Sequence, residues 1–155
     1  MSLSASILSK HPLATVGDWQ AAIDAAGFKL FLDDDAQRPI SDLGGHLPAA
    51  WEGREAGFEC YPGDVEAADF AEDCEVMAVG GPWSHVLDIH YVGFANSAGV
   101  AIAGAVYAHA TGGFFWEGEG GERVDADVAL AYARRIEGEI REFLRQEDAR
   151  MQDTE

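Results

Sequence analysis

Cysteine is scarce in this chain, with only Cys60 and Cys74 among 155 residues. The two show no CxxC spacing, so the sequence carries neither a disulfide framework nor a recognised zinc motif. A chain of this length buries roughly two-thirds of its unfolded surface, so it can form a core without disulfide bonds. We therefore expect a protein of a reducing compartment, in which the two thiols can either pair or stay free.

A secretory signal is also missing. Residues 1–10, MSLSASILSK, contain no apolar run of useful length and no clear cleavage site. Together with the cysteine usage, this favours the cytoplasm. The sequence shows no internal repeat and no low-complexity linker, so we expect one domain over residues 1–155, with frayed ends at about 1–12 and 150–155.

Basic residues are few: 10 Lys and Arg stand against 28 Asp and Glu, which gives a net charge of −18. A field of this sign repels nucleic acid and anionic membranes, and it attracts cations and basic proteins. The acids are unevenly placed, with nine between Glu52 and Glu75 and a further group at Asp33-Asp34-Asp35. Two interpretations stay open: a docking surface for a basic partner, or a surface that only keeps the protein soluble.

Motifs for metals and nucleotides fail when their spacing is checked. The triple aspartate lacks a calcium loop, because the sixth and twelfth positions are Arg38 and Gly44 instead of Gly and Glu. His85 and His90 lie five positions apart on an expected strand and so point to opposite faces. The loop at 118–121 has glycines but no lysine, and its glutamates would repel phosphate. We expect no metal and no other cofactor.

The longest uncharged run, from Ile89 to Trp116, organises the fold. Its small residues predict a buried helix from Ala98 to Ala110, capped by Asn96 or Ser97 and ended at Thr111-Gly112-Gly113. A membrane-spanning helix is the alternative, but no Lys/Arg cluster flanks the run, and most of it is Ala and Gly. A buried helix of a water-soluble domain is favoured.

Other segments show shorter signals. Thr15 begins a helix with Trp19 and Ile23 on its inner side. The chain from Ile40 to Gly57 is irregular because of its Gly and Pro breakers. The remaining expected elements are strands at 29–33, 57–61 (with Phe58 and Cys60 on one face, and Pro62 ending it), 74–79, 85–92 and 114–116, an acidic helix at 64–73, and a final helix from Asp125 to about Arg150 with the apolar stripe Val128, Tyr132, Ile136, Ile140, Phe143 and Leu144.

This mixture of helices and irregularly spaced strands predicts an α+β fold. We expect a mixed or antiparallel sheet of about four to five strands, with helices packed on one face and a long C-terminal helix. Along the final helix, the spacing pairs Glu137 with Arg141 and Arg135 with Glu139.

Tryptophans and histidines suggest a second kind of site. Trp83, His85, His90 and Trp116 could line the pocket of a small enzyme or ligand-binding protein. Asp88 shares a face with His90, so a histidine activated by a carboxylate is conceivable. A nucleophile beside them is not identifiable, since Cys60 fits equally well as a small core residue.

Three phrases together resemble a known kind of protein: Gly45-His46-Leu47-Pro48, Gly57-Phe58-Glu59, and the Ala/Gly helix that ends at Thr111-Gly112-Gly113 before an aromatic strand and an acidic turn. In layout the chain resembles small bacterial immunity proteins, which are partners of secreted polymorphic toxins. The resemblance implies a cytoplasmic protein without catalysis that occludes the active site of one toxin.

We therefore expect a non-enzymatic acidic protein that binds a basic protein partner, with the carboxylates standing where the partner would otherwise meet phosphate. Trp51 is expected to add apolar contact. The alternatives are a small enzyme or ligand-binding protein, or an acidic structural or assembly component with no small ligand. Whether the chain forms a homodimer stays open. The expected partner-binding residues are Asp33, Asp34, Asp35, Trp51, Glu52, Glu55, Asp64, Glu66 and Asp69.

Overall fold

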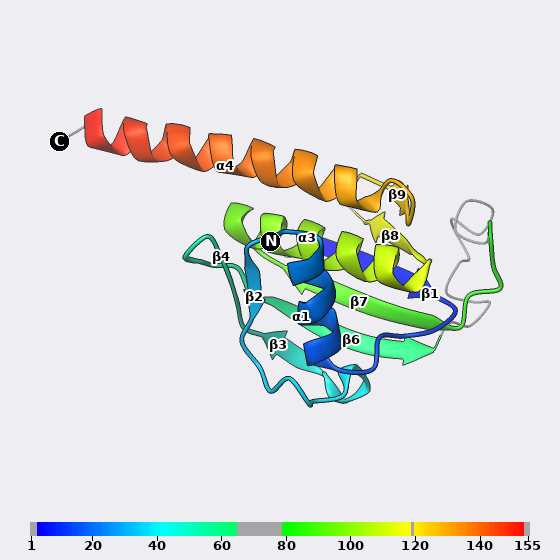
Figure 1. The fold of residues 1–155 in the computed structure, drawn as a ribbon. Helices are drawn as coiled ribbons and strands as arrows, with labels where there is room; N and C mark the ends of the chain where they lie inside the picture. Colours follow the sequence, from blue (N-terminus) through cyan, green and yellow to red (C-terminus); the bar gives the residue numbers. More distant parts are fainter. Residues whose placement is uncertain (1–2, 65–78, 119, 154–155) are drawn as a thin grey trace.

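The computed structural model describes residues 3–64, 79–118 and 120–153. Figure 1 shows how their elements are arranged. In chain order these are β1 (Leu3–Ser9), α1 (Val16–Ala25), β2 (Leu30–Leu32), the 3-10 helix η1 (Ile40–Asp42), β3 (Gly45–Leu47), β4 (Ala49–Trp51), β5 (Arg54–Glu55), β6 (Phe58–Asp64), β7 (His85–Tyr91), α3 (Phe94–Thr111), β8 (Phe114–Glu117), β9 (Glu122–Asp125) and α4 (Ala129–Asp153).

The strands form two antiparallel sheets. The larger has six strands in the order β3-β6-β7-β1-β8-β9, and the smaller has three in the order β2-β4-β5. The α+β class and the long C-terminal helix are confirmed, whereas the expected count of four to five strands is too low. The missing strands lie largely between Ile40 and Gly57, where glycines and prolines separate the short strands β3, β4 and β5.

Where the structure describes the two ends, at residues 3–12 and 150–153, it shows regular elements in place of most of the expected fraying. β1 lies in the middle of the six-stranded sheet, where it pairs with β7 on one side and β8 on the other. Its sequence alternates small polar and apolar residues, and Ala5 and Ile7 are buried beneath α3. At the other end of the chain, α4 continues to Asp153.

Helix α3 is the centre of the molecule: it covers one face of the large sheet, and α4 lies across it (Figure 1). The buried small-residue helix is confirmed, but it begins at Phe94 after Gly93, not at Asn96 or Ser97. Ser97 instead donates its hydroxyl to the Gly93 carbonyl at 2.9 Å. The helix ends as expected, with Gly112 in the left-handed conformation at φ 71°. No helix in the described ranges combines the length and apolarity of a membrane span.

Glycine in α3 allows the sheet to come close. A Cβ added at Gly104 would lie 2.4 Å from the Phe115 ring, whereas one added at Gly138 in α4 would meet nothing within 4 Å. We expect Gly104→Ala to lower the free energy of unfolding by about 1–3 kcal/mol because of overpacking. Gly138→Ala is the matched control and should be neutral or raise stability by up to about 1 kcal/mol. Urea unfolding measures both, and equal effects would contradict this packing.

The inner side of α4 agrees with the expected stripe at Tyr132, Ile140 and Leu144, which pack against the core, but differs from it elsewhere. Val128 and Phe143 are exposed, while Ala129 and Ala133 are fully buried against the rest of the core. Ala129 and Ala133 are buried because α4 packs on α3. Since α3 is itself built of small residues, the two helices approach closely, and only small side chains such as alanine fit between them. The Glu137–Arg141 pair is confirmed at 3.6 Å.

Three further expectations about α4 and β6 are wrong. Arg135 pairs with Glu122 of β9 at 3.9 Å, not with Glu139. Asp125 ends a strand, and α4 begins only at Ala129. Pro62 does not end β6, which continues to Asp64 with Pro62 opposite Leu87. The remainder of the expected acidic helix at 64–73, and the expected strand at 74–79 except for Val79, lie outside the described residues.

Candidate functional site

The three-stranded sheet turns one aromatic side chain toward solvent. In β2, Leu30 and Leu32 are buried, whereas Phe31 between them is 59% exposed. The strand alternation explains this, since neighbouring residues point to opposite faces. Phe31 stands opposite Ala50 of β4, which in turn stands opposite Glu55 of β5. Phe31, Ala50 and Glu55 therefore form a row across the outer face of the sheet, with an exposed aromatic ring at one end and an exposed carboxylate at the other.

The edge of this sheet is closed by a side chain. Gln20 of α1 donates its amide Nε2 to the Leu30 carbonyl at 2.9 Å and accepts from the Leu32 N–H at 2.7 Å. The side-chain amide thus makes the two hydrogen bonds that a further strand would make. As a result, the face of the sheet, and not its β2 edge, is open to a partner.

The triple aspartate continues directly from β2. The Asp33 N–H donates to the Pro48 carbonyl at 2.8 Å, and the Gly17 N–H holds the loop against α1 by donating to Ala36 at 2.8 Å. Asp34 turns inward to Arg38 at 2.6 Å. A hydrogen bond from the Asp35 N–H, and then the Arg38 contact, lower the pKa of Asp34 below its ordinary value. Asp33 and Asp35 remain exposed.

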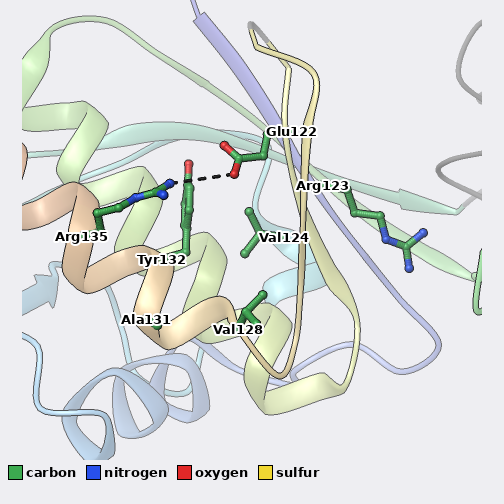
Figure 2. A pocket seen from close by; sticks show the side chains of 7 residues that line it. All are labelled: Glu122, Arg123, Val124, Val128, Ala131, Tyr132 and Arg135. Atoms are coloured by element: carbon green, nitrogen blue, oxygen red, sulfur yellow. Dashed lines mark ion pairs between the residues drawn. The ribbon is translucent and has the colours of Figure 1, made fainter.

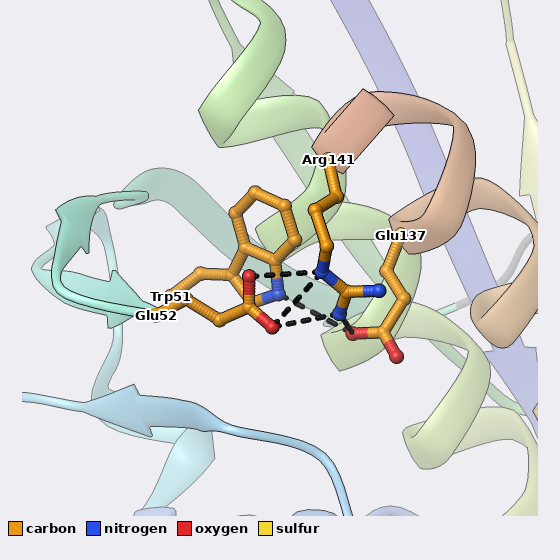
Figure 3. A network of polar contacts seen from close by, with 4 residues as sticks. All are labelled: Trp51, Glu52, Glu137 and Arg141. Atoms are coloured by element: carbon orange, nitrogen blue, oxygen red, sulfur yellow. Dashed lines mark hydrogen bonds and ion pairs between the residues drawn. The ribbon is translucent and has the colours of Figure 1, made fainter. Parts of the chain in front are cut away.

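Trp51 lies in the core, which corrects the expectation that it contacts a partner. It is only 1% exposed. Its register in β4 points the ring inward, and its Nε1 donates to Glu137 of α4 at 3.3 Å (Figure 3). The same alternation that exposes Phe31 buries Trp51, since Trp51 stands opposite Leu30. Phe31, and not Trp51, is therefore the exposed aromatic side chain of this sheet.

Glu52 fastens the β4–β5 hairpin to α4. It lies at the turn with φ 50°, and its Oε1 accepts from the Arg141 Nη2 at 2.7 Å (Figure 3). A second ion pair follows further along the helix, between Arg54 and Asp148 at 2.8 Å. The Glu52 carboxylate is thus engaged within the chain and is less available to a partner than Asp33 or Glu55.

The Glu52–Arg141 pair makes stability depend on pH. Hydrogen bonds from Arg141 are the main reason that the pKa of Glu52 lies below its ordinary 4.5. A depressed folded-state pKa contributes stability above the unfolded-state pKa, and that stability is lost as pH falls through the folded-state pKa. We expect Glu52→Gln to cost about 0.2–1 kcal/mol at neutral pH and progressively less below about pH 4.5. Urea unfolding of both proteins across this range measures the difference, with Glu55→Gln as the control; a constant difference would contradict the pairing.

Of the other expected acids, only Asp64 is among the described residues, and it lies apart from these. Asp64 ends β6 of the large sheet, opposite His85. Glu66 and Asp69 lie outside the described residues. The structure thus places Phe31, Ala50 and Glu55 on one sheet face, with Asp33 and Asp35 in the loop that leaves it. We call these five residues the Phe31 face. The sequence-based expectation missed Phe31. The pattern Leu-Phe-Leu in a strand already indicates that Phe31 points to the face opposite its two leucine neighbours.

The expected pocket of two tryptophans and two histidines is divided in the structure. Trp83 lines a cavity of about 410 Å³ that also contains Lys10 and His11. His90 lines a different cavity, of about 310 Å³, with His46 and Glu59. Trp116 and Trp83 pack around Leu8 and Phe114 on the sheet face away from α3. Trp83 and His90 therefore do not line a common pocket.

Reactive groups expected from the sequence are engaged or buried. Asp88 accepts a hydrogen bond from the Ser6 hydroxyl at 2.7 Å. Cys60 carries a free thiol in the core, and burial raises its pKa to about 12, so it is protonated and unreactive at neutral pH. Within the ranges that the structure describes, no group of three or more His, Cys, Asp or Glu residues could hold a metal ion.

No family model, curated protein or solved structure matches this chain. The likeness to immunity proteins therefore stays a prediction. The features that bear on function are the exposed ring and the carboxylates of the Phe31 face.

Proposed function

We propose that this chain is a non-enzymatic acidic protein that binds a basic protein partner through the Phe31 face. The observation that carries the proposal is the 59% exposed ring of Phe31, the most exposed aromatic side chain in the described part of the molecule. Single exposed apolar residues are common, but this one stands in register with Glu55 and two residues before Asp33. An aromatic anchor with a charged rim is the usual composition of a protein interface.

The charges and the ring have separate tasks in this binding. The net charge of −18 draws a basic protein toward the surface and raises its association rate. Asp33, Asp35 and Glu55 then pair with Lys or Arg side chains of the partner. Phe31 excludes water from the centre of the contact, which slows dissociation and strengthens the surrounding ion pairs.

A toxin that acts on nucleic acid is the partner class that fits this chemistry best. Such an enzyme has a basic site that binds phosphate, and a surface of carboxylates can occupy that site in place of the substrate. The layout that resembles immunity proteins supports the same partner. In this role the chain acts in the cytoplasm and neutralises the toxin by covering its active site, without any reaction of its own.

Binding to a candidate toxin domain, such as one encoded beside this gene, tests the proposal. Calorimetry should give a one-to-one complex, and co-expression with the toxin should restore growth of the host. The variant Phe31→Arg should bind about 100-fold more weakly and protect the host less, while keeping the unfolding midpoint of the unmodified protein. A complex of unchanged affinity with this variant would place the interface elsewhere.

A further inference from the structure

On the Phe31 face, a small residue separates the aromatic ring from a carboxylate. Phe31 of β2 stands opposite Ala50 of β4, and Ala50 stands opposite Glu55 of β5. Neighbouring strands lie about 4.8 Å apart, so the backbones that carry the ring and the carboxylate are about 10 Å apart. Ala50 is partly exposed and contributes a single methyl group between them. The side chains of Phe31 and Glu55 therefore rise on either side of Ala50.

Elsewhere in this molecule, arginines combine an aromatic ring with a carboxylate. Two arginines of α4 do so: Arg135 with Tyr132 and Glu122 (Figure 2), and Arg141 with Trp51 and Glu52 (Figure 3). Their guanidinium groups lie 5.4 and 5.9 Å from the ring centroids, and their ion pairs measure 3.9 and 2.7 Å. The ring attracts the cation through its quadrupole, while the N–H groups donate to the carboxylate.

A third arginine occupies a setting that resembles the Phe31 face. Phe114 of β8 stands opposite Asp125 of β9, so the ring and the carboxylate come from neighbouring antiparallel strands. The Arg123 guanidinium lies 4.0 Å from the centroid of the Phe114 ring, and its Nε donates to Asp125 at 2.8 Å. On the Phe31 face the ring and the carboxylate are one strand further apart. Among the described residues, no arginine of the chain lies over Phe31 or pairs with Glu55.

We infer that the partner places an arginine between Phe31 and Glu55. The arginine belongs to the basic partner of the proposed function, on which this inference rests. Its guanidinium lies on the ring of Phe31, above Ala50, and donates to the Glu55 carboxylate. A cation within about 6 Å of a ring centroid that also donates over about 2.8 Å spans the interval between the two side chains.

Lysine fits this place less well than arginine does. An ammonium group is a compact and strongly hydrated charge, whereas a guanidinium is planar, more weakly hydrated, and stacks on a ring while its edge donates to a carboxylate. Because Phe31 and Glu55 flank the same methyl group, only the planar cation uses both at once. The preference for arginine over lysine should therefore be about threefold in affinity, as expected for a cation on an exposed ring.

A second copy of this chain has no unengaged arginine to insert. Seven of the eight arginines form an ion pair with a carboxylate of their own chain. The eighth, Arg134, donates to the Ala26 carbonyl at 2.5 Å. The remaining two cations are lysines, and the net charge of −18 on each copy adds repulsion. The arginine therefore comes from a protein other than this chain.

Tyr61 offers a matched comparison on another part of the surface. Its ring is 40% exposed and lies beside the Glu59 carboxylate, but its own hydroxyl donates to that carboxylate at 2.8 Å. The ring also packs against His90, with the centroids 5.7 Å apart. Because the ring and the carboxylate engage each other, this pair should not select arginine.

Two peptides of equal charge, hexa-arginine and hexalysine, test the inference by calorimetric titration into the full-length protein. The unmodified protein should bind hexa-arginine about threefold more tightly than hexalysine. In Phe31→Leu, which keeps an apolar side chain but removes the aromatic face, this ratio should fall at least twofold. Tyr61→Leu is the matched control and should leave the ratio unchanged. Phe31 is 59% exposed, so Phe31→Leu should keep the unfolding midpoint of the unmodified protein.

Equal binding of the two peptides to the unmodified protein would overturn the inference, and so would a ratio that Phe31→Leu does not lower. Either result leaves the proposed function standing if Phe31→Arg still weakens the toxin complex, so the two failures are distinguishable. A dimer in sedimentation equilibrium that Phe31→Arg dissociates would also overturn the inference, because it would assign this face to a second copy.

Discussion

Replacing Phe31 with arginine should weaken binding to the basic partner about 100-fold, which corresponds to about 2.7 kcal/mol. The substitution removes the apolar centre of the contact and adds a positive charge beside Asp33 and Glu55. Both changes act on the complex, because the 59% exposed ring contributes little to the core of the free protein. Calorimetric titration of the partner into each protein measures the loss.

Tyr61→Arg is the control for this experiment. Tyr61 is 40% exposed and lies on β6 of the large sheet, where its hydroxyl donates to Glu59 at 2.8 Å. The added charge is the same, but the location differs from the Phe31 face. Affinity should fall by less than about threefold in this control. Equal losses in the two variants would mean that net charge alone, and not the Phe31 face, governs binding.

Replacing Trp19 with alanine should lower the free energy of unfolding by about 3–5 kcal/mol. Trp19 is fully buried at the junction of α1, α3 and β6. Its ring lies 6.1 Å from that of Phe58 and 5.4 Å from that of Tyr107, measured between centroids. Its Nε1 donates to the Ala103 carbonyl at 2.9 Å.

Urea unfolding compares this variant with two others. Trp19→Phe keeps a ring but loses the Nε1 donor and part of the volume, so its cost should be intermediate. Phe143→Ala, at an exposed position of α4, should cost less than about 1 kcal/mol. If Trp19→Ala also cost less than 1 kcal/mol, the packing of α1 onto α3 described above would be incorrect.

Helices were predictable because their signals are local. Thr15 accepts from the Asp18 N–H at 3.1 Å as the cap that the sequence indicated, and Trp19 and Ile23 are buried as their spacing predicted. Gly112 likewise ends α3. A cap and a periodic stripe depend on residues three or four positions apart, so neighbouring sequence is enough to recognise them.

Short strands were missed because their stability comes from distant partners. β1 is a strand because β7 and β8 pair with its two edges, about 80 and 110 residues away in sequence. The alternation of serine with apolar residues in the β1 sequence is, on its own, only a weak signal for a strand. β9 has a different reason: its partner β8 is close in sequence, but Asp125 indicates a helix start, which hides the strand that ends there.

The candidate site was predictable only in part. The exposed positions of Asp33, Asp35 and Glu55 agree with the sequence-based expectation, because charged side chains in loops and short hairpins remain in water. Whether Trp51 or Phe31 faces outward could not be known without the pairing of β2 with β4 and the place of α4. A shift of one residue in register would exchange the two rings.

The salt dependence of partner binding tests the central claim most directly. The association constant should fall steeply as salt rises for the unmodified protein, and less steeply for the triple variant Asp33→Asn, Asp35→Asn, Glu55→Gln, because screening acts on the charges that the variant lacks. An affinity that does not respond to salt, or an identical salt dependence in the two proteins, would contradict an acidic docking surface centred on Phe31.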